Sequence, residues 1–353
     1  MIRPDLPDSA AWASALGISN EAVDLYRRSD VIDLHVDSFI WRRVFGYDLT
    51  RRHAPGLLGA RYFGQVDFPR ILEAGVSGAT WVITTNPFRS SAGRARAFAR
   101  NVKDLLEVFA GASESFEVVK SAAEYRSARR IGKHAAFIGV QGANALDYDV
   151  AEWGRIPNAA VVRVTLVHLS SSRIGATSSP LGRADQGLTD LGRDVVRVLN
   201  ASRIFVDLAH ISKKGFFDAV EAHDRSLPIV VTHTGVSGVY RHWRNLDDDQ
   251  LRAIADSGGT IGVMYHCPFL GGSSRGNASL VADHLEHIVR TVGDDFASLG
   301  SDWDGSIVTP RDMPTCLELP RLVQILLDRR LAPESIQKIL GGNFLRALTM
   351  LRG

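Results

Sequence analysis

VIDLHVD (residues 31–37) is the stretch that decides the fold class, and seven runs of similar character follow it along the chain. They are GATWVITT (78–85), AAFIGVQG (135–142), AVVRVTLVHL (160–169), RIFVDLAH (203–210), PIVVTHT (228–234), GTIGVMYH (259–266) and FASLGSDWDG (296–305). Each is short and nearly continuously apolar, which is typical of strands that are buried on both faces of a parallel sheet.

Segments with helical spacing lie between these runs, at 68–75, 92–112, 189–202 and 247–258. Thr189 can cap the third segment, and the fourth has acidic residues in its first turn and Gly258 past its last turn. Eight strands alternating with helices predict an α/β fold, a (β/α)8 TIM-like barrel. An open doubly wound sheet is the alternative, because periodicity does not show closure. We expect residues 1–353 to form a single domain, with the first 30 and last 45 residues as helical additions.

Composition excludes several classes of function. The chain has 353 residues, and its 41 basic and 39 acidic residues give a net charge of +2, so it lacks the basic patch of a nucleic-acid-binding protein. Its two cysteines cannot form a disulfide framework. The sequence has neither the pattern of a signal peptide nor an apolar stretch long enough to span a membrane. We therefore expect a cytoplasmic protein.

Polar residues of metal-binding type close most of the eight runs. In chain order they are His35 and Asp37, Gln141, His168, His210, His233, His266 and Asp302. One polar residue at a strand end is usually only the solvated start of a loop. In a parallel barrel, however, all carboxyl ends of the strands face one mouth, where barrel enzymes have their active sites. So many histidines and aspartates at that mouth indicate a functional site.

Neutral imidazole and carboxylate groups together suit Zn²⁺ or a similar dication. His35 and Asp37 are two residues apart on a strand and share a face, so they can chelate one ion. His210 and His233 lie on adjacent strands and can chelate a second ion. Asp302 lies on the strand that neighbours the first strand, where it can transfer a proton between water and a leaving amine.

The other candidate residues have structural interpretations. His53, His134, His223 and His242 fall outside the strand ends in loops or helical segments, and we interpret them as structural or solvated. His284 and His287 lack the spacing of helix-borne zinc proteases, so we interpret them as an exposed helix face. His266 is interpreted as structural, and Cys267 as a buried thiol.

The ordered segments resemble the membrane (renal) dipeptidase family of the amidohydrolase superfamily. They are DLHVD, VTLVH, GLTDLGRDVVRVLN, VDLAHIS, VVTHT, RNLDDDQLRAIADSGGTIGV, LGSDWDG and GGNFLRAL, and they span about residues 31–348. The resemblance implies a first zinc on His35 and Asp37 and a second on His210 and His233. It further implies that His168 stabilises the oxyanion, that Arg244 pairs with the substrate's terminal carboxylate, and that Asp302 is the general acid/base. The resemblance also implies that the protein could form a homodimer.

Gln141 departs from the family pattern, in which a Glu at this position bridges both metal ions. A Gln side chain is uncharged and has one oxygen acceptor beside an NH2 donor, so it bridges two dications poorly. Three outcomes are open: two ions held more weakly, which we favour, one ion with adapted chemistry, or loss of metal and activity.

The sequence thus predicts a zinc-dependent dipeptidase that hydrolyses small dipeptides with a free C-terminal carboxylate, using metal-activated water. One alternative is a mononuclear amidohydrolase or lactonase that acts on another small carboxylated substrate. The other, which follows from Gln141, is a catalytically silent ligand-binding barrel.

Overall fold

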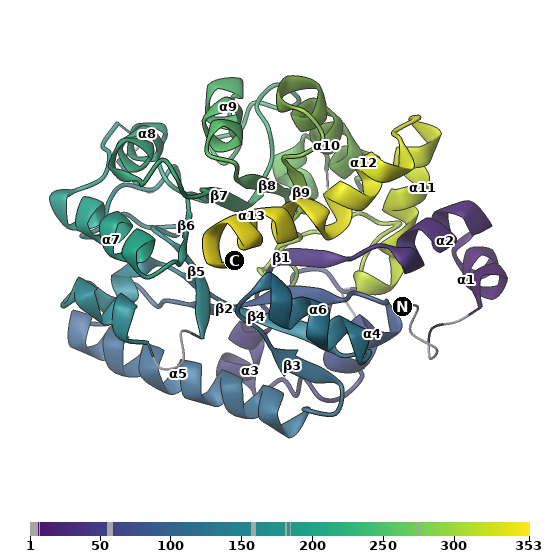
Figure 1. Ribbon diagram of the computed structural model, residues 1–353, viewed down its shortest axis with the longest axis horizontal. Coiled ribbons are helices and arrows are strands. Elements are labelled where there is room, and N and C mark those ends of the chain that lie inside the picture. The colour runs from purple at the N-terminus through teal and green to yellow at the C-terminus, as the bar shows by residue number, and fades with distance from the viewer. Residues whose placement is uncertain are drawn as a thin grey trace.

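The computed structural model describes residue 6 and residues 8–54, 59–156, 160–180, 182–183, 185–273 and 275–353. All eight predicted strands are present and parallel (Figure 1). They are β1 (Ile32–Val36), β2 (Gly78–Thr84), β4 (His134–Gln141), β5 (Val161–Thr165), β6 (Phe205–Asp207), β7 (Val230–Thr234), β8 (Thr260–Val263) and β9 (Ala297–Leu299).

The strands form a closed barrel. Each strand pairs with the next one in this series, with β2 pairing directly to β4, and β9 pairs with β1. The ring therefore closes as predicted, and the open doubly wound sheet is excluded. A short additional strand, β3 (Phe116–Val118), pairs only with the first residues of β4. Its three residues carry no pattern that distinguishes them from the adjoining loop.

Helices surround the barrel, and further helices precede its first strand and follow its last strand (Figure 1). Before and within the first half of the barrel they are α1 (Ser9–Leu16), α2 (Asn20–Arg28), α3 (Phe39–Phe45), α4 (Phe68–Glu73), α5 (Ser91–Gly111) and α6 (Ala122–Arg130). The second half contains α7 (Asp190–Ala201), α8 (Lys213–Ala222), α9 (Asp248–Asp256) and α10 (Ser279–Val292). The chain then ends with α11 (Pro320–Asp328), α12 (Pro333–Gln337) and α13 (Asn343–Arg352), the last two joined by a π-turn, η6 (Lys338–Gly342).

Short 3₁₀ helices shape some of the loops. They are η1 (Ala143–Leu146), η2 (Val150–Arg155), η4 (Cys267–Leu270) and η5 (Cys316–Glu318). None of the helices within the described residues has the length and apolar character needed to cross a bilayer.

The predicted helix boundaries follow from their caps. The side chain of Thr189 accepts a hydrogen bond from the Gly192 amide at the start of α7. Asp247 and Gln250 form a reciprocal capping box at the start of α9, and Gly258 follows that helix with φ of 75°. The local sequence thus sets where these two helices begin and where α9 ends.

Helix α13 covers the amino-terminal end of the barrel, toward the viewer in Figure 1. Its Phe344 packs against Phe137 and Phe205. Its Arg346 and Arg352 donate to backbone carbonyls just before β8 and at the start of β5. These contacts close one end of the barrel and leave the carboxyl ends of the strands as its mouth.

Candidate metal centre

The candidate residues gather at the mouth of the barrel. His35 and His233 lie within β1 and β7, Gln141 is the last residue of β4, and Asp37 follows β1 directly. The other three each lie three residues past a strand: His168 after β5, His210 after β6 and Asp302 after β9. Because these loop residues still turn inward, the barrel brings side chains together that are more than 260 residues apart in sequence.

One cluster forms around His35. Its Nε2 lies 3.3 Å from Asp37 Oδ2 and 3.8 Å from Asp302 Oδ1. His35, His233 and Asp302 can each offer one ligand atom with all three atoms within 4.8 Å of one another. Asp302 has a left-handed backbone with φ of 64°, a conformation that L-residues adopt rarely and that aims its carboxylate into this cluster.

A second cluster forms around His233. The Nε2 atoms of His210 and His233 lie 2.8 Å apart, and the amide nitrogen of Gln141 lies 3.1 Å from the first and 3.4 Å from the second. His210, like Asp302, has a left-handed backbone, with φ of 66°. His233 thus stands between the two clusters, and its ring centroid lies 3.8 Å from that of His35.

Burial keeps the imidazoles neutral. It lowers the pKa of His210 and His233 well below the ordinary value, and the neighbouring positive charge of Arg244 lowers both further. Burial also lowers the pKa of His168 to about 4. Neutral imidazoles retain a lone pair for a metal ion.

Asp302 has the opposite shift. Burial raises its pKa well above the ordinary value, and the nearby carboxylate of Asp37 raises it further, while Arg244 opposes both effects. Two buried carboxyl groups this close repel each other unless a cation or a proton lies nearby.

These groups fit a divalent metal ion. The imidazole nitrogens of His210 and His233 lie 2.8 Å apart, so one shared proton at most can satisfy both. The nearby carboxyl groups of Asp37 and Asp302 are buried, where negative charge is unfavourable without a cation. A cation relieves both problems, and nitrogen with carboxylate oxygen is the donor set that zinc and similar ions prefer.

Gln141 fits this centre less well than the other residues. Its NH2 group faces His210 and His233, and its Oε1 atom lies 3.3 Å from the hydroxyl of Thr84, which also donates to Asp37 at 3.0 Å. An amide nitrogen has no lone pair to give to a metal ion. Gln141 could therefore contribute to a metal site only through Oε1, after its amide turns over.

Arg244 lies in the loop after β7 and is buried, with 3% of its surface exposed. Its guanidinium donates to the backbone carbonyl of His233, beside the second cluster. Burial lowers its pKa to about 10, which leaves it charged at neutral pH, and within the described part of the chain it has no ion pair with a carboxylate. A substrate carboxylate would provide the missing partner.

Sequence reasoning missed a polar layer beneath the centre. Arg163, fully buried on β5, donates to His35 Nδ1 at 2.7 Å and forms an ion pair with Asp207 at 3.1 Å. Asp207 also accepts from the hydroxyl of Thr232 at 2.7 Å. Gly139 makes room for the guanidinium, because a Cβ atom there would lie 2.7 Å from Arg163 Nε. The signal was present as a single charged residue within the apolar run AVVRVTLVHL.

The prediction that His284 lies on an exposed helix face is wrong. His284 is fully buried on α10, where its Nδ1 accepts from the Val236 amide and its Nε2 donates to the Leu270 carbonyl. The apolar face of α10 packs inward, and the polar imidazole is satisfied by two loop backbones. His287 keeps partial exposure and pairs with Asp248.

The remaining histidines stay outside both clusters. His266 lies past β8 and its Nδ1 accepts from the Val308 amide, while Cys267 is buried with a free thiol. The prediction that His134 lies in a loop or helix is wrong, because it is the first residue of β4, at the end of the barrel opposite the mouth. It bonds to the Val76 carbonyl there, so its role is structural.

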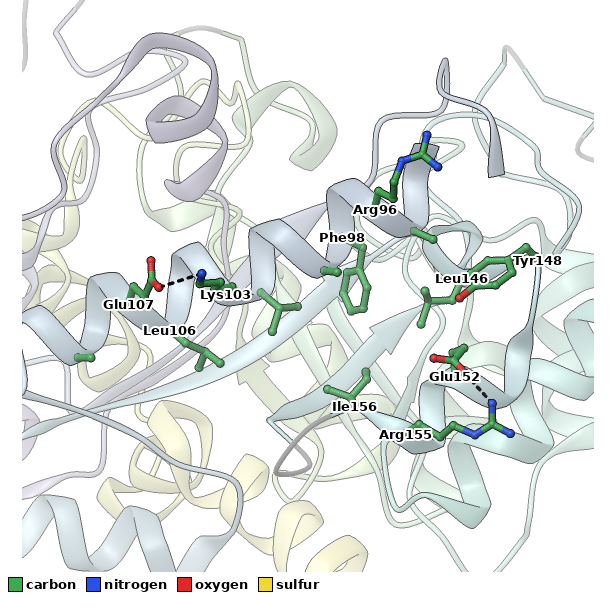
Figure 2. Close-up of a pocket in the computed structure, with 14 residues that line it drawn as sticks. Arg96, Phe98, Lys103, Leu106, Glu107, Leu146, Tyr148, Glu152, Arg155 and Ile156 are labelled. Carbon is green, nitrogen blue, oxygen red and sulfur yellow. Dashed lines mark hydrogen bonds and ion pairs between the residues drawn. The ribbon is translucent and has the colours of Figure 1, made fainter. Parts of the chain in front are cut away.

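One large cavity lies away from the mouth. It has a volume of about 690 Å³ and lies between α5 and the η1–η2 segment. Figure 2 shows Phe98, Leu106, Leu146 and Ile156 facing it. None of its lining residues is a candidate metal ligand. The candidate site is therefore identified by the chemistry of its side chains and not by the size of a cavity.

Comparisons with known proteins show which family the chain belongs to. A family model described as membrane dipeptidase (peptidase family M19) matches residues 19–352. An uncharacterized protein in the pqqA 5' region of Klebsiella pneumoniae is 30% identical over 252 residues, which cover 69% of this chain and 92% of that protein.

Solved structures give the same result. The dipeptidase AC, a metallopeptidase of family M19, is 26% identical with a TM-score of 0.80, covering 92% of this chain and 98% of that one. A metallopeptidase from Rhodobacter sphaeroides, liganded with a phosphinate mimic of the dipeptide L-Ala-D-Ala, is 25% identical with a TM-score of 0.79, covering 92% and 99%. The protein is a metal-dependent hydrolase, and the chain belongs to the membrane dipeptidase family, peptidase family M19.

Proposed function

We propose that the protein is a zinc-dependent dipeptidase that hydrolyses the amide bond of small dipeptides with a free C-terminal carboxylate. The observation that carries this proposal is the convergence of His35, Asp37, His210, His233 and Asp302 beside a buried arginine without a carboxylate partner in the described part of the chain. The dipeptide mimic held by the Rhodobacter relative supports a substrate of this size.

His35 and Asp37 would hold one zinc ion and His210 and His233 a second, with Gln141 in the weakened bridging position. We favour two ions, as the paired clusters around His35 and His233 suggest. When bound, zinc lowers the pKa of water and polarises a carbonyl group, which supplies a nucleophile at neutral pH.

The residues of the chain supply orientation and proton transfer. Arg244 would bind the terminal carboxylate with its two-pronged guanidinium, which fixes the scissile amide over the centre. His168 is neutral, since its pKa is about 4, and it would donate a hydrogen bond to the carbonyl oxygen as negative charge develops there. Asp302 would accept a proton from the attacking water and deliver it to the leaving amine.

The test is metal content per chain together with turnover of a dipeptide panel. We expect bound zinc, hydrolysis of free dipeptides, and much slower hydrolysis of the same dipeptides with an amidated C-terminus. Asp302→Asn should lower kcat by about 100-fold or more, because proton transfer is lost, whereas Asp256→Asn on the exposed face of α9 should have no effect. Metal-free protein that binds dipeptides without hydrolysing them would instead support the silent ligand-binding barrel.

A further inference from the structure

A second hollow adjoins the metal centre at the carboxyl end of β2. It has a volume of about 340 Å³ and lies between α3, the loop after β2, and α5. Four arginines line it, Arg43, Arg89, Arg94 and Arg100, with Asp104 as the only acidic residue among its lining side chains. We call it the arginine pocket.

Three of the four arginines lack a carboxylate partner within the described residues. Arg94 is engaged, since it pairs with Asp147 at 2.5 Å and donates to the Asn144 carbonyl. Arg43 donates one bond to the Thr84 carbonyl at 3.2 Å, and its buried Nε has no partner in the described part of the chain. Arg89 and Arg100 form no ion pair there either. The pocket therefore holds an excess of positive charge.

The guanidinium groups of Arg43 and Arg89 act on each other. Burial lowers the pKa of Arg43, and repulsion from Arg89 lowers it further, while the carboxylate of Asp37 raises it. Arg43 is therefore close enough to interact electrostatically with both Asp37, a candidate metal ligand, and Arg89. An anion in the pocket would relieve that repulsion.

Thr84 lines the arginine pocket and also contacts residues of the metal centre. Its hydroxyl faces Asp37 and Gln141, and its backbone carbonyl faces Arg43. The pocket also lies across the barrel from Arg244, because β2 and β7 are four strands apart in either direction around the ring of eight. A substrate held at one end by Arg244 and crossing the centre would direct its other end toward β2.

We propose that the arginine pocket binds an anionic side chain on the amino-terminal residue of the substrate, so that the enzyme prefers dipeptides that begin with Glu or Asp. This inference rests on the proposed dipeptidase function. Arginine suits the role because its planar guanidinium pairs with both oxygens of a carboxylate. A dipeptide with two carboxylates would then be held by Arg244 on the β7 side and by Arg43 and Arg89 on the β2 side.

The test compares Glu-Ala with the nearly isosteric Gln-Ala. We expect kcat/KM to favour Glu-Ala by about tenfold or more, with the preference reduced at high salt. Arg89→Gln should bring the ratio close to one, and Arg89→Lys should restore part of it. The matched control is Arg197→Gln on the exposed face of α7, which should leave the ratio as in the wild type.

A binding measurement separates failure of this inference from failure of the proposed function. Calorimetry with the Asp302→Asn variant should show tighter binding of Glu-Ala than of Gln-Ala, by the same order as the kcat/KM ratio. Equal affinity for the two dipeptides would overturn the arginine pocket, whatever the turnover. Selective binding of Glu-Ala without hydrolysis by the wild type would keep the pocket and contradict the dipeptidase.

Discussion

At the scale of single residues, we expect Gln141 to limit how much positive charge the centre can hold. Its neutral amide faces the two imidazoles of His210 and His233, where a carboxylate would attract cations. We expect Gln141→Glu to bind the second zinc ion about tenfold more tightly or better, measured as metal content at fixed free zinc. Gln186→Glu, on an exposed loop residue, is the control and should bind no more zinc than the wild type. An unchanged zinc content in Gln141→Glu would show that the amide is not what limits the site.

Arg163 shows why part of the site could not be predicted from the sequence. Metal-binding histidines usually donate their second ring N–H to an acceptor. Here the partner of His35 Nδ1 is a guanidinium donor, so the neutral ring carries its hydrogen on Nε2, facing Asp37. That proton must leave before Nε2 can bind a metal ion. Strand periodicity places Arg163 on β5, but only the closed barrel brings it to a side chain 128 positions away.

At the scale of secondary structure, the order and identity of the barrel strands could be predicted, but their lengths could not. The residues that close the fourth, fifth and eighth predicted runs, His168, His210 and Asp302, lie three residues beyond β5, β6 and β9. A continuous apolar run does not distinguish a strand from the buried loop that follows it. The left-handed backbone at His210 and Asp302 marks where the chain leaves the sheet, and nothing in the local sequence predicts it.

Helix α10 gives a pH-dependent prediction. Its buried His284 accepts from the Val236 amide, and burial lowers its pKa to about 4. The unfolded chain, with a histidine pKa near 6.5, takes up a proton that the folded chain refuses, so stability is full above pH 6.5 and is lost as the pH falls toward 4. His284 alone should contribute about 3 kcal/mol to that loss.

The measurement is the free energy of unfolding of the wild type and His284→Asn between pH 4 and 7. The variant is expected to be less stable at pH 7, because the imidazole bonds are lost, but to have a shallower pH dependence. The two curves should therefore converge as the pH falls. Parallel curves would mean that His284 does not titrate on unfolding.

At the scale of the whole molecule, one barrel accounts for both the fold and the position of the centre. The barrel brings candidate ligands from β1, β7 and the loops after β6 and β9 to one mouth, and α13 closes the opposite end. The sequence predicts helical additions in the first 30 and last 45 residues, and both segments contain helices. Their docking could not be predicted, since it depends on side chains such as Phe344 that meet the barrel only in the folded state. We propose that the chain is a single domain in which the centre and the core unfold together.

If so, metal binding and global stability are coupled, and metal removal tests both ideas. An ion that binds only the folded state, at about 100 times its Kd, stabilises by about 2.7 kcal/mol. Thermal unfolding should show one transition whose Tm falls by a few degrees with a chelator and recovers with zinc. His233→Asn should abolish the response to zinc, because His233 belongs to both ligand clusters, whereas His53→Asn in an outlying loop should keep it. Two separate transitions would contradict the single domain. If the Tm of the wild type is the same with and without chelator, the candidate ligands do not hold a metal ion in solution.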